Sequence, residues 1–522
     1  MSSPSRAAPA APPRRAPRPA RQLLGILVLA LTACHATTRP ATVPQLTPIQ
    51  QLQHDIDAIL AAPALEHSFW GVLVMSLAHD ADGALYSLNA RKLLMPASNM
   101  KIVTLGAAAE RLGWDYRYET RLVASGSIEG GTLSGDLVVV GSGDPSIVSP
   151  DGTALPVFDS WADQLVARGL RRIDGRIVGD DNAFDDETLG TGWTWEDLAE
   201  GYAGGVSALQ FNDSVVHATV VPGLAVGDAA IVSLAPVGSG LVVRNELETT
   251  AAGTPSSIEA RRLPGGVALE LRGSVAIDSA PRVRVLSVDN PTLFFVTALR
   301  RALIGHGIDV RGPAVDVDEI ARPRPPSDGP PLLTHHSPPL SDLAVTLMKV
   351  SLNFDAETFL KTLGARAGTP TFGGGLAEAR SVVDAWGVEP GGLIMRDGSG
   401  LSRYNYVTAQ TLVTILTHID RDDRLREPFE RALPIAGRDG TLARRMKGTP
   451  AEGNARAKTG SFASARALSG YVRTADGEPL VFSILGNNFD TPAAAVDQAC
   501  DAIVVRLARF TRAARTSERG TP

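Results

Sequence analysis

The chain has 522 residues, of which 44% are hydrophobic and 20% are charged, a composition typical of globular proteins. Its length exceeds that of one ordinary domain and allows two or three. The formal net charge of −6 and the aromatic content of 5% supply neither a basic surface nor many stacking surfaces, so nucleic acid is excluded as an expected partner.

The first 33 residues have the pattern of a cleaved export signal. Five arginines precede an apolar run at 23–31, which is too short to span a bilayer as a permanent helix. The run ends in Leu31-Thr32-Ala33-Cys34, which resembles the lipobox of bacterial lipoproteins. This resemblance implies that Cys34 is lipidated and that residues 34–50 form a tether. An ordinary signal peptide with an incidental cysteine is the alternative.

A lipidated Cys34 predicts an exported protein anchored to a bacterial membrane on its periplasmic side, because several acyl chains give stable anchoring. His35 follows in place of aspartate, which favours the outer membrane in a Gram-negative cell. The second cysteine, Cys500, lies in an apolar helical pattern, so we expect a buried, inert thiol.

Residues 51–113 begin the main domain. The pattern at 69–77 predicts a strand, and residues 83–88 predict its hairpin partner. Apolar periodicity at 98–112 predicts a helix that begins at Ser98. Backbone N–H groups at a helix N-terminus are free to stabilise an oxyanion, and Lys101 lies one turn along the same face.

Between residues 114 and 331 the hydrophobic pattern of the sequence changes. Short Val- and Ile-rich runs, such as 135–145 and 231–244, alternate with Gly, Asp and Pro turns. Helical patterns are fewer and lie at 158–169 and 293–305. We therefore predict a β-rich insertion of two subdomains. Prolines between 322 and 339 predict a stiff linker, with His335-His336 in a solvated loop.

Residues 332–512 complete the main domain. The expected helices lie at 340–350, 355–363, 376–386 and 409–419. Three strand-like runs follow at hairpin spacing, at 455–461, 469–474 and 480–487, and a helix at 491–510 closes the domain. Residues 513–522 have the composition of a disordered tail.

Lysine is rare in this chain, with six lysines among the 50 basic residues. One of them ends Ser98-Asn99-Met100-Lys101, and another begins Lys458-Thr459-Gly460. An ammonium group can lose its proton when it is buried, whereas a guanidinium cannot. The first motif therefore predicts a serine nucleophile with a lysine base. The alternative is a helix N-cap serine with a surface lysine one turn on.

Ser351-Leu352-Asn353 supplies a third element between the two lysine motifs. It follows one predicted helix and opens another, so both polar side chains can project into a cleft. A second S-x-N, Ser87-Leu88-Asn89, lies in the hairpin before the nucleophile. We interpret that copy as a polar strand edge and a turn.

Together, S-x-x-K, S-x-N and K-T-G are the signature of penicillin-interacting serine enzymes. The gap from Ser98 to Ser351 is 253 residues and the gap from Ser351 to Lys458 is 107. With this spacing the chain resembles, from about 52 to 510, the D-alanyl-D-alanine carboxypeptidase/endopeptidase family, the class C low-molecular-mass penicillin-binding proteins. Leu352 departs from the family, which commonly has aspartate there, so we expect altered local packing. Further segments that match lie at 96–101, 141–145, 209–213, 397–402 and 437–442.

The resemblance implies an α+β fold in which an antiparallel sheet flanked by helices, as in penicillin-binding proteins and serine β-lactamases, is interrupted by the insertion. It implies that Ser98 is the nucleophile and that Lys101, kept neutral by burial and by the charge of Lys458, is its base. Ser351 would pass a proton to the leaving nitrogen, and Asn353 would orient Lys101 and the substrate amide.

The K-T-G strand has the remaining implied roles. The terminal carboxylate would bind to Lys458, Thr459, Gly460 and Ser461. The backbone N–H groups of Ser98 and Ser461 would form the oxyanion hole. By the same resemblance, a carboxylate at Asp180 or Asp181 would face the amine of a diamino acid; an aspartate in a turn is the alternative.

The implied reaction is hydrolysis of D-Ala-D-Ala and of D-Ala cross-links in peptidoglycan stem peptides, with β-lactam antibiotics as inhibitors. No metal or organic cofactor is implied, and a homodimer is among the assemblies that the resemblance allows. The alternatives are a serine β-lactamase or esterase on the same fold and an inactive, peptidoglycan-binding lipoprotein.

Overall fold

The structure is a computed structural model, and it describes residues 46–78, 83–149, 152–322 and 324–512. The predicted export signal, the lipidation site Cys34 and the predicted tail at 513–522 lie outside these residues, so those expectations stay predictions. Among the described helices, none is both long and apolar enough to cross a membrane.

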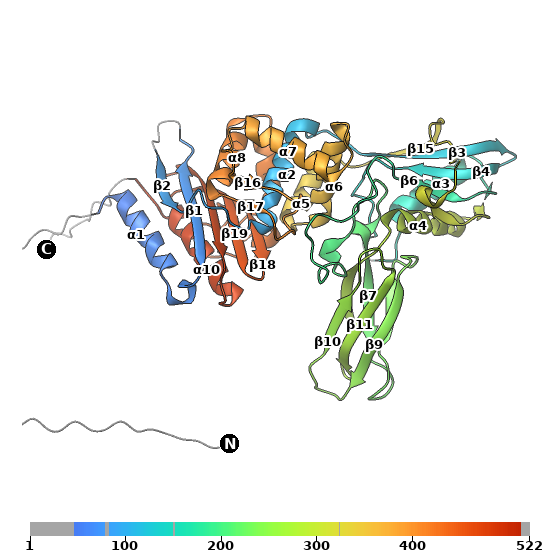
Figure 1. The fold of residues 1–522 in the computed structure, drawn as a ribbon, viewed down its shortest axis with the longest axis horizontal. Coiled ribbons are helices and arrows are strands. Elements are labelled where there is room, and N and C mark those ends of the chain that lie inside the picture. Colours follow the sequence, from blue (N-terminus) through green and yellow to red (C-terminus); the bar gives the residue numbers. More distant parts are fainter. Residues whose placement is uncertain (1–45, 79–82, 150–151, 323, 513–522) are drawn as a thin grey trace, which may run out of the picture. The chain divides into compact units, whose positions relative to one another are not determined.

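An antiparallel five-stranded sheet lies at the centre of what we call the main region, residues 46–112 and 340–512 (Figure 1). Its strand order is β18-β19-β20-β1-β2. The inner strands are apolar almost throughout, because helices cover both faces of the sheet. The strand predictions at both ends of the domain are confirmed. The strands are β1 (Phe69–Ser76), β2 (Ala84–Leu88), β18 (Arg456–Phe462), β19 (Ala465–Arg473) and β20 (Pro479–Asn487).

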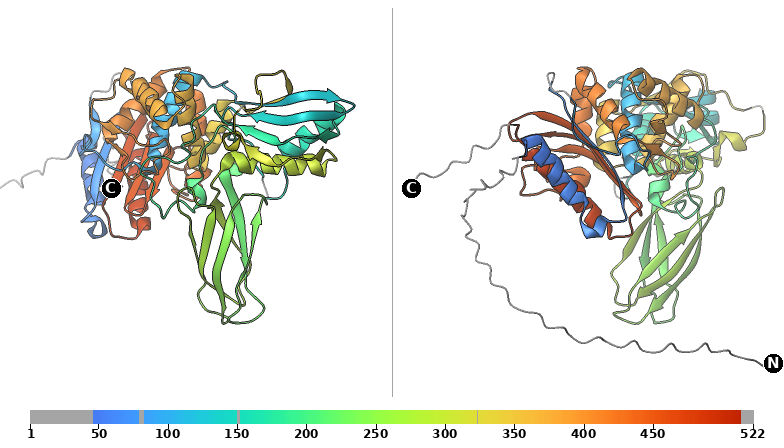
Figure 2. Two further views of the ribbon diagram at one scale, coloured as in Figure 1. Left: turned by 45° about the vertical axis from the view of Figure 1, so that its right-hand side comes forward. Right: turned by 60° about the vertical axis from the view of Figure 1, so that its left-hand side comes forward.

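One face of this sheet is covered by α1 (Pro48–Leu60) and α10 (Ala493–Ala508), which lie side by side (Figure 2). The predicted helix at 491–510 is thus confirmed. The tether predicted to reach residue 50 is wrong at its end, because α1 already begins at Pro48. Thr47 and Gln50 form a capping box there, in which each side chain accepts the other's backbone N–H.

The opposite face packs against α2 (Met100–Leu112) and α8 (Ala409–Arg421), which share a core with neighbouring helices. Residues 100–109 of α2 are all buried, so this helix is the centre of the domain. The helix predictions are confirmed with shifted ends, and α9 was not predicted. The surrounding helices are α5 (Leu340–Lys349), α6 (Asn353–Arg366), α7 (Phe372–Ala385) and α9 (Arg426–Ala432).

The insertion, which the structure extends to residues 114–336, contains three sheets. The largest has seven strands in the order β13-β5-β4-β3-β15, with β6 beside β4 and β14 beside β6. Two predicted helices, α3 (Pro156–Ala167) and α4 (Pro291–Gly305), pack together in its core (Figure 1). The strands are β3 (Glu119–Glu129), β4 (Thr132–Val140), β5 (Arg172–Ile173), β6 (Ile177–Asp180), β13 (Asp309–Val310), β14 (Ala314–Asp316) and β15 (Pro331–His336).

Two three-stranded sheets complete the insertion, in the orders β10-β11-β9 and β12-β7-β8. Their buried side chains join those of the larger sheet in one contiguous core. The β-rich character is confirmed, and the division into two subdomains stays a prediction. The strands are β7 (Val215–Val221), β8 (Ile231–Ala235), β9 (Val242–Thr250), β10 (Ser257–Arg261), β11 (Ala268–Ala276) and β12 (Arg282–Ser287).

The proline-rich stretch after residue 322 is the clearest difference from expectation. Instead of a stiff linker throughout, it contains β15, which pairs antiparallel with β3. His335 therefore lies in a strand rather than in a solvated loop, and its ring contacts Trp161 with centroids 5.4 Å apart. Edge strands tolerate proline because one row of their N–H groups needs no ladder partner, and β15 is at the edge of its sheet.

Candidate active site

The predicted nucleophile, Ser98, lies in a 3₁₀ turn, η2 (Ala97–Asn99), directly before α2. The turn is tight, since Ala97 has φ 45°, a left-handed value that is uncommon for a residue with a side chain. The Asn99 side chain anchors it by donating a 2.9 Å hydrogen bond to the Lys458 carbonyl on β18. Ser98 itself is half-buried, so its hydroxyl can meet a substrate.

Lys101 lies one turn further along and is fully buried. Its Nζ donates to Ser98 Oγ at 2.9 Å, to Asn353 Oδ1 at 2.6 Å and to the Ser399 carbonyl at 2.9 Å. The surface-lysine alternative is therefore wrong for this motif. The carboxamide and carbonyl oxygens can only accept hydrogen bonds, whereas the Ser98 hydroxyl can also donate one.

Burial lowers the pKa of Lys101 to about 7, although the carboxyl groups of Glu357, Asp397 and Asp355 act in the opposite direction. The expected contribution of Lys458 to this shift is not found. Instead, burial and the charge of Lys101 lower the pKa of Lys458 well below its usual value. The two buried lysines are thus close enough for the charge of Lys101 to disfavour the charged form of Lys458.

The S-x-N segment connects α5 to α6. Ser351 has φ 64°, a left-handed conformation, and its Oγ accepts a 2.7 Å hydrogen bond from Lys458 Nζ. Asn353 is the first residue of α6, so its side chain reaches Lys101 from the opposite side of the site. Leu352 packs against an apolar cluster that includes Phe184 of the insertion, which accounts for a leucine at this position.

The K-T-G motif lies on β18, the edge strand of the main sheet. Lys458 is fully buried, and Thr459 Oγ1 donates a 2.8 Å hydrogen bond to Thr441 Oγ1. A Cβ at Gly460 would come within 2.5 Å of the Pro96 carbonyl and 3.2 Å of Ser98 N. Only glycine therefore allows the strand to lie against the nucleophile turn. Ser461 is exposed beside it.

Three residues to which the sequence analysis gave no role support the loop that holds Lys101. They are Glu357, Asp397 and Trp193. The buried carboxylate of Glu357 accepts hydrogen bonds from the backbone N–H groups of Gly398 and Ser399, both at 2.8 Å. These bonds fix the loop whose Ser399 carbonyl accepts from Lys101. Burial raises the pKa of Glu357 to about 8. The matching segment at 397–402 was a signal for this loop, but Glu357 lies on another helix, α6.

Asp397 holds the same loop from inside. Its carboxylate accepts hydrogen bonds from Gly400 N at 2.8 Å, from Asn405 Nδ2 at 2.7 Å, from Ser402 N, and from the Trp193 indole at 3.0 Å. The loop lies between β16 (Leu393–Ile394) and β17 (Tyr406–Val407). Because Trp193 belongs to the insertion, this bond joins the insertion to the support of the catalytic lysine.

A second link comes from the other side of the site. Asn353 Nδ2 donates a 2.9 Å hydrogen bond to the backbone carbonyl of Tyr202, also in the insertion. The Tyr202 hydroxyl in turn donates to Asp197 at 2.8 Å. Asn353 thus uses its oxygen for Lys101 and its amide nitrogen for the insertion, and its rotamer is fixed by both.

The remaining candidates lie elsewhere. Asp181 accepts hydrogen bonds from Ser207 and Thr292, so its partners belong to the insertion rather than to the catalytic residues. Its carboxylate lies within 4.8 Å of those of Asp316 and Asp318, a cluster of the kind that can hold a cation. The second S-x-N is a turn, as expected: Asn89 has φ 47°. Cys500 is buried and unpaired, and burial raises the pKa of its thiol to about 12.

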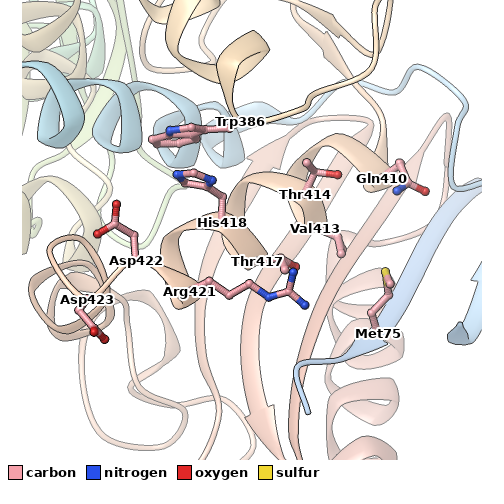
Figure 3. A pocket seen from close by; sticks show the side chains of 10 residues that line it. All are labelled: Met75, Trp386, Gln410, Val413, Thr414, Thr417, His418, Arg421, Asp422 and Asp423. Carbon is pink, nitrogen blue, oxygen red and sulfur yellow. The ribbon is translucent and has the colours of Figure 1, made fainter. Parts of the chain in front are cut away.

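A groove on the helical face is separate from this site. It has a volume of about 680 Å³, lies along α8, and is lined by none of the predicted site residues (Figure 3). His418 stacks on Trp386 there, with ring centroids 4.5 Å apart and an interplanar angle of 18°. Figure 3 shows Arg421 extending along the groove from the same helix.

The chain matches the model of the D-Ala-D-Ala carboxypeptidase 3 (S13) family over residues 52–510. It is 36% identical over 474 residues to the D-alanyl-D-alanine carboxypeptidase of Actinomadura sp. (strain R39), covering 88% of this chain and 85% of that protein. The crystal structure of penicillin binding protein 4 (dacB) from Haemophilus influenzae superposes with a TM-score of 0.76 at 25% identity, covering 89% of this chain and 100% of that one. Its complex with a β-lactam gives 0.70 at 24% identity over the same shares. Because the family model spans most of its length, the chain belongs to the D-Ala-D-Ala carboxypeptidase 3 (S13) family.

Proposed function

We propose that this protein is a serine D,D-carboxypeptidase and D,D-endopeptidase that cleaves D-Ala-D-Ala and D-Ala cross-links of peptidoglycan through an acyl-enzyme on Ser98. One observation carries the proposal. A buried lysine, Lys101, is bonded to the Ser98 hydroxyl and to two oxygens that can only accept. Membership in the carboxypeptidase family and the shared fold with a penicillin-binding protein support it.

In the attack step, neutral Lys101 acts as the general base. Its two N–H bonds point to Asn353 Oδ1 and to the Ser399 carbonyl, so its lone pair is left facing Ser98 Oγ. Ser98 then attacks the carbonyl of the penultimate D-Ala while Lys101 takes its proton. The developing oxyanion is stabilised by the N–H groups of Ser98 and Ser461.

Collapse of this intermediate needs a proton for the leaving nitrogen. Ser351 has the position for this role, since Lys458 donates to its hydroxyl at 2.7 Å. The terminal carboxylate of the substrate binds beside Lys458, Thr459, Gly460 and Ser461, and its negative charge favours the protonated form of Lys458. A protonated Lys458 in turn favours the neutral, basic form of Lys101. Substrate binding thereby sets the protonation states that catalysis requires.

The proton that Lys101 took from Ser98 passes by way of Ser351 to the leaving nitrogen, so Lys101 is neutral again. In deacylation Lys101 takes a proton from the water that attacks the ester, and this proton returns to Ser98 Oγ as the ester bond breaks. A β-lactam acylates Ser98 by the same first step, but its leaving group stays attached and obstructs the water. The named complex of the Haemophilus protein with a β-lactam supports this inhibition. In this proposal every step is carried out by side chains of the protein itself, namely Ser98, Lys101, Ser351, Asn353 and Lys458.

We also propose that the protein works on the periplasmic side of a bacterial membrane, to which a lipid on Cys34 anchors it. The lipobox-like sequence at residues 31–34 supports this proposal. Labelling with a radioactive fatty acid during expression tests it. Label in the wild-type chain and none in a Cys34→Ser variant is the expected result, and label in both would contradict lipidation at this cysteine.

The test of the enzymatic proposal is a time course of intact mass after benzylpenicillin is added, with Ser98→Ala measured in parallel. We expect a lasting adduct of one drug molecule on the wild-type chain and none on the variant. A turnover assay on a pentapeptide ending in D-Ala-D-Ala completes the test, and released D-alanine is the expected product.

The other outcomes identify the alternatives. Drug that is consumed without a lasting adduct would identify a serine β-lactamase or esterase on this fold. An unchanged drug and unchanged peptide, together with binding to peptidoglycan, would identify an inactive binding protein and would overturn the proposal.

A further inference from the structure

A cavity of about 420 Å³ opens beside the S-x-N segment, between the main region and the insertion. Its floor is formed by residues 350–354, which include the catalytic Ser351 and Asn353. Its opposite wall belongs to the insertion and consists of Glu200, Gly201, Tyr202, Asp213, Val215, Val283, Arg284 and Val285. The cavity therefore shares Ser351 and Asn353 with the site, although Ser98, Lys101 and Lys458 do not line it.

The cavity is larger than a terminal D-alanine requires. Its volume falls within the range of about 300–1,000 Å³ that is typical of pockets for whole small molecules. A single residue with a methyl side chain leaves most of this space empty. The proposed reaction places the leaving nitrogen at Ser351, so a longer leaving group that passes Ser351 enters the cavity.

The walls carry charges of both signs. Arg284 forms an ion pair with Glu200, with 2.5 Å between Nη2 and Oε1. Among the described residues, the carboxylate of Asp213 has no hydrogen-bond or ion-pair partner, and burial raises its pKa to about 6. Asp213 is half-buried, and a carboxyl group in this environment without a partner is available to a donor on a ligand.

Backbone strain points to the same place. Asn212, Asp213 and Ser214 are consecutive residues with φ near 54°, and none of them is glycine. Left-handed residues usually occur singly, and strain of this kind concentrates at ligand-binding sites. Ser351, on the opposite side of the cavity, is also left-handed. The fold thus keeps strained residues on both walls.

Apolar side chains form the rim. Val283 and Val285 of β12 are 58% and 43% exposed, and Val350 at the end of α5 is 63% exposed. The exposed valines suit the methylene groups of a ligand, the carboxylate of Asp213 suits an amine, and the guanidinium of Arg284 suits a carboxylate. A cross-linked stem peptide, whose leaving strand is joined through a diamino acid, has this chemistry.

We propose that this cavity is a subsite for the leaving strand of cross-linked peptidoglycan, with Asp213 receiving an N–H group of that strand. The inference rests on the proposed function, because it places the strand by the role of Ser351. It predicts that the insertion selects cross-linked substrates, whereas linear D-Ala-D-Ala peptides use the main region alone.

The experiment narrows the cavity at its rim with Val283→Trp and compares two substrates on the purified full chain. The matched control is Val242→Trp, on β9, because Val242 is 57% exposed and does not line the cavity. We expect Val283→Trp to lower kcat/KM for a cross-linked peptide dimer at least tenfold. Hydrolysis of a linear pentapeptide and acylation by benzylpenicillin should stay within twofold, and the control should match wild type throughout.

Asp213→Asn provides a second measurement that does not depend on the tryptophan variant folding. It should raise KM for the dimer severalfold and leave the linear peptide unchanged. Equal effects on both substrates, or no effect on either, would overturn the subsite. Wild-type protein that cleaves the linear peptide but not the dimer would overturn the subsite while the proposed function stands. Failure of acylation and of both hydrolyses would instead overturn the proposed function, and the subsite with it.

Discussion

The main region and the insertion contribute to the site in different ways. The main region supplies every proposed catalytic side chain, and the lysines among them are fully buried with several short contacts each. The insertion contacts Asn353 through the Tyr202 carbonyl, and through the Trp193 indole it contacts Asp397 in the loop that supports Lys101. The proposed catalytic side chains thus belong to the main region, while the insertion supports them by hydrogen bonds and lines the cavity beside them.

The difference follows from how each region is packed. Lys101 lies on α2, whose buried residues share a core with five further helices, so its position is set by many neighbours. Where the insertion faces the cavity it has exposed valines and the carboxylate of Asp213, which has no partner among the described residues. The comparison predicts large losses for changes in the first region and small or substrate-selective losses for changes in the second.

The largest effect should come from Lys101→Arg. A guanidinium cannot act as a base and does not fit the space of the buried ammonium, so we expect acylation by benzylpenicillin to fall about 10³-fold. Lys361→Arg is the matched control, because Lys361 is also buried but pairs with Asp185 of the insertion. Similar losses in both variants would show that arginine disrupts folding rather than the base.

The pH dependence of acylation sharpens the assignment of the base. Lys101 must be neutral, and with a pKa of about 7 it becomes protonated as the pH falls. The acylation rate should therefore reach a plateau above pH 8 and decline about tenfold per pH unit well below 7. Stopped-flow measurement between pH 5 and 9 checks this. A rate that is flat across this range would contradict Lys101 as the base.

Glu357→Gln tests the positioning of that lysine from within the main region. Glutamine can accept only one of the two backbone N–H groups, so the Ser399 carbonyl loses part of its support. We expect acylation to fall about tenfold and unfolding free energy to fall by about 1–3 kcal/mol. With a pKa of about 8, Glu357 is largely uncharged at the pH where Lys101 titrates, so the midpoint of the pH profile should change little.

The control for Glu357→Gln is Glu430→Gln, because Glu430 is a partly buried carboxyl group in α9 whose pKa is also raised by burial. That variant should keep the wild-type acylation rate. A midpoint that moves by a full pH unit or more in Glu357→Gln would mean that Glu357 is charged when Lys101 titrates, and would contradict its role as a support of the loop alone.

The smallest effect should come from the insertion, in Trp193→Phe. This change removes one donor to Asp397 and leaves its three other hydrogen bonds. We expect acylation to fall two- to fivefold, in line with about 1 kcal/mol for one hydrogen bond. Trp195→Phe is the control, since Trp195 is 53% exposed in the same loop. A loss of acylation as large as that of Glu357→Gln would contradict the expectation that changes in the insertion have smaller effects than changes in the main region.

Local patterns predicted most of the fold. Alternating and continuous apolar runs gave the strands of the main sheet, and 3.6-residue periodicity gave α2, α5, α8 and α10, because these elements bury one face or both. Besides α9, helix α1 and strand β15 were missed, for opposite reasons. Helix α1 begins in a stretch that reads as a tether, and β15 is rich in proline, which normally argues against a strand.

The sequence by itself was enough to propose the catalytic residue types. The scarcity of lysine, the S-x-x-K spacing on one helical face and the glycine of K-T-G depend on chemistry that few residues can perform, so they are visible in the chain alone. Glu357 and Trp193 could not be found in this way. They act by hydrogen bonds to a loop far away in sequence, and nothing local marks them.

Only the tertiary structure decided how these residues meet. It buries Lys101 and Lys458, places Lys101 Nζ 2.9 Å from Ser98 Oγ, and sets Asp213 in a cavity beside Ser351. The physical reason is that burial, hydrogen-bond direction and pKa depend on groups brought together from distant segments, whereas sequence periodicity reports only which face of each element is apolar.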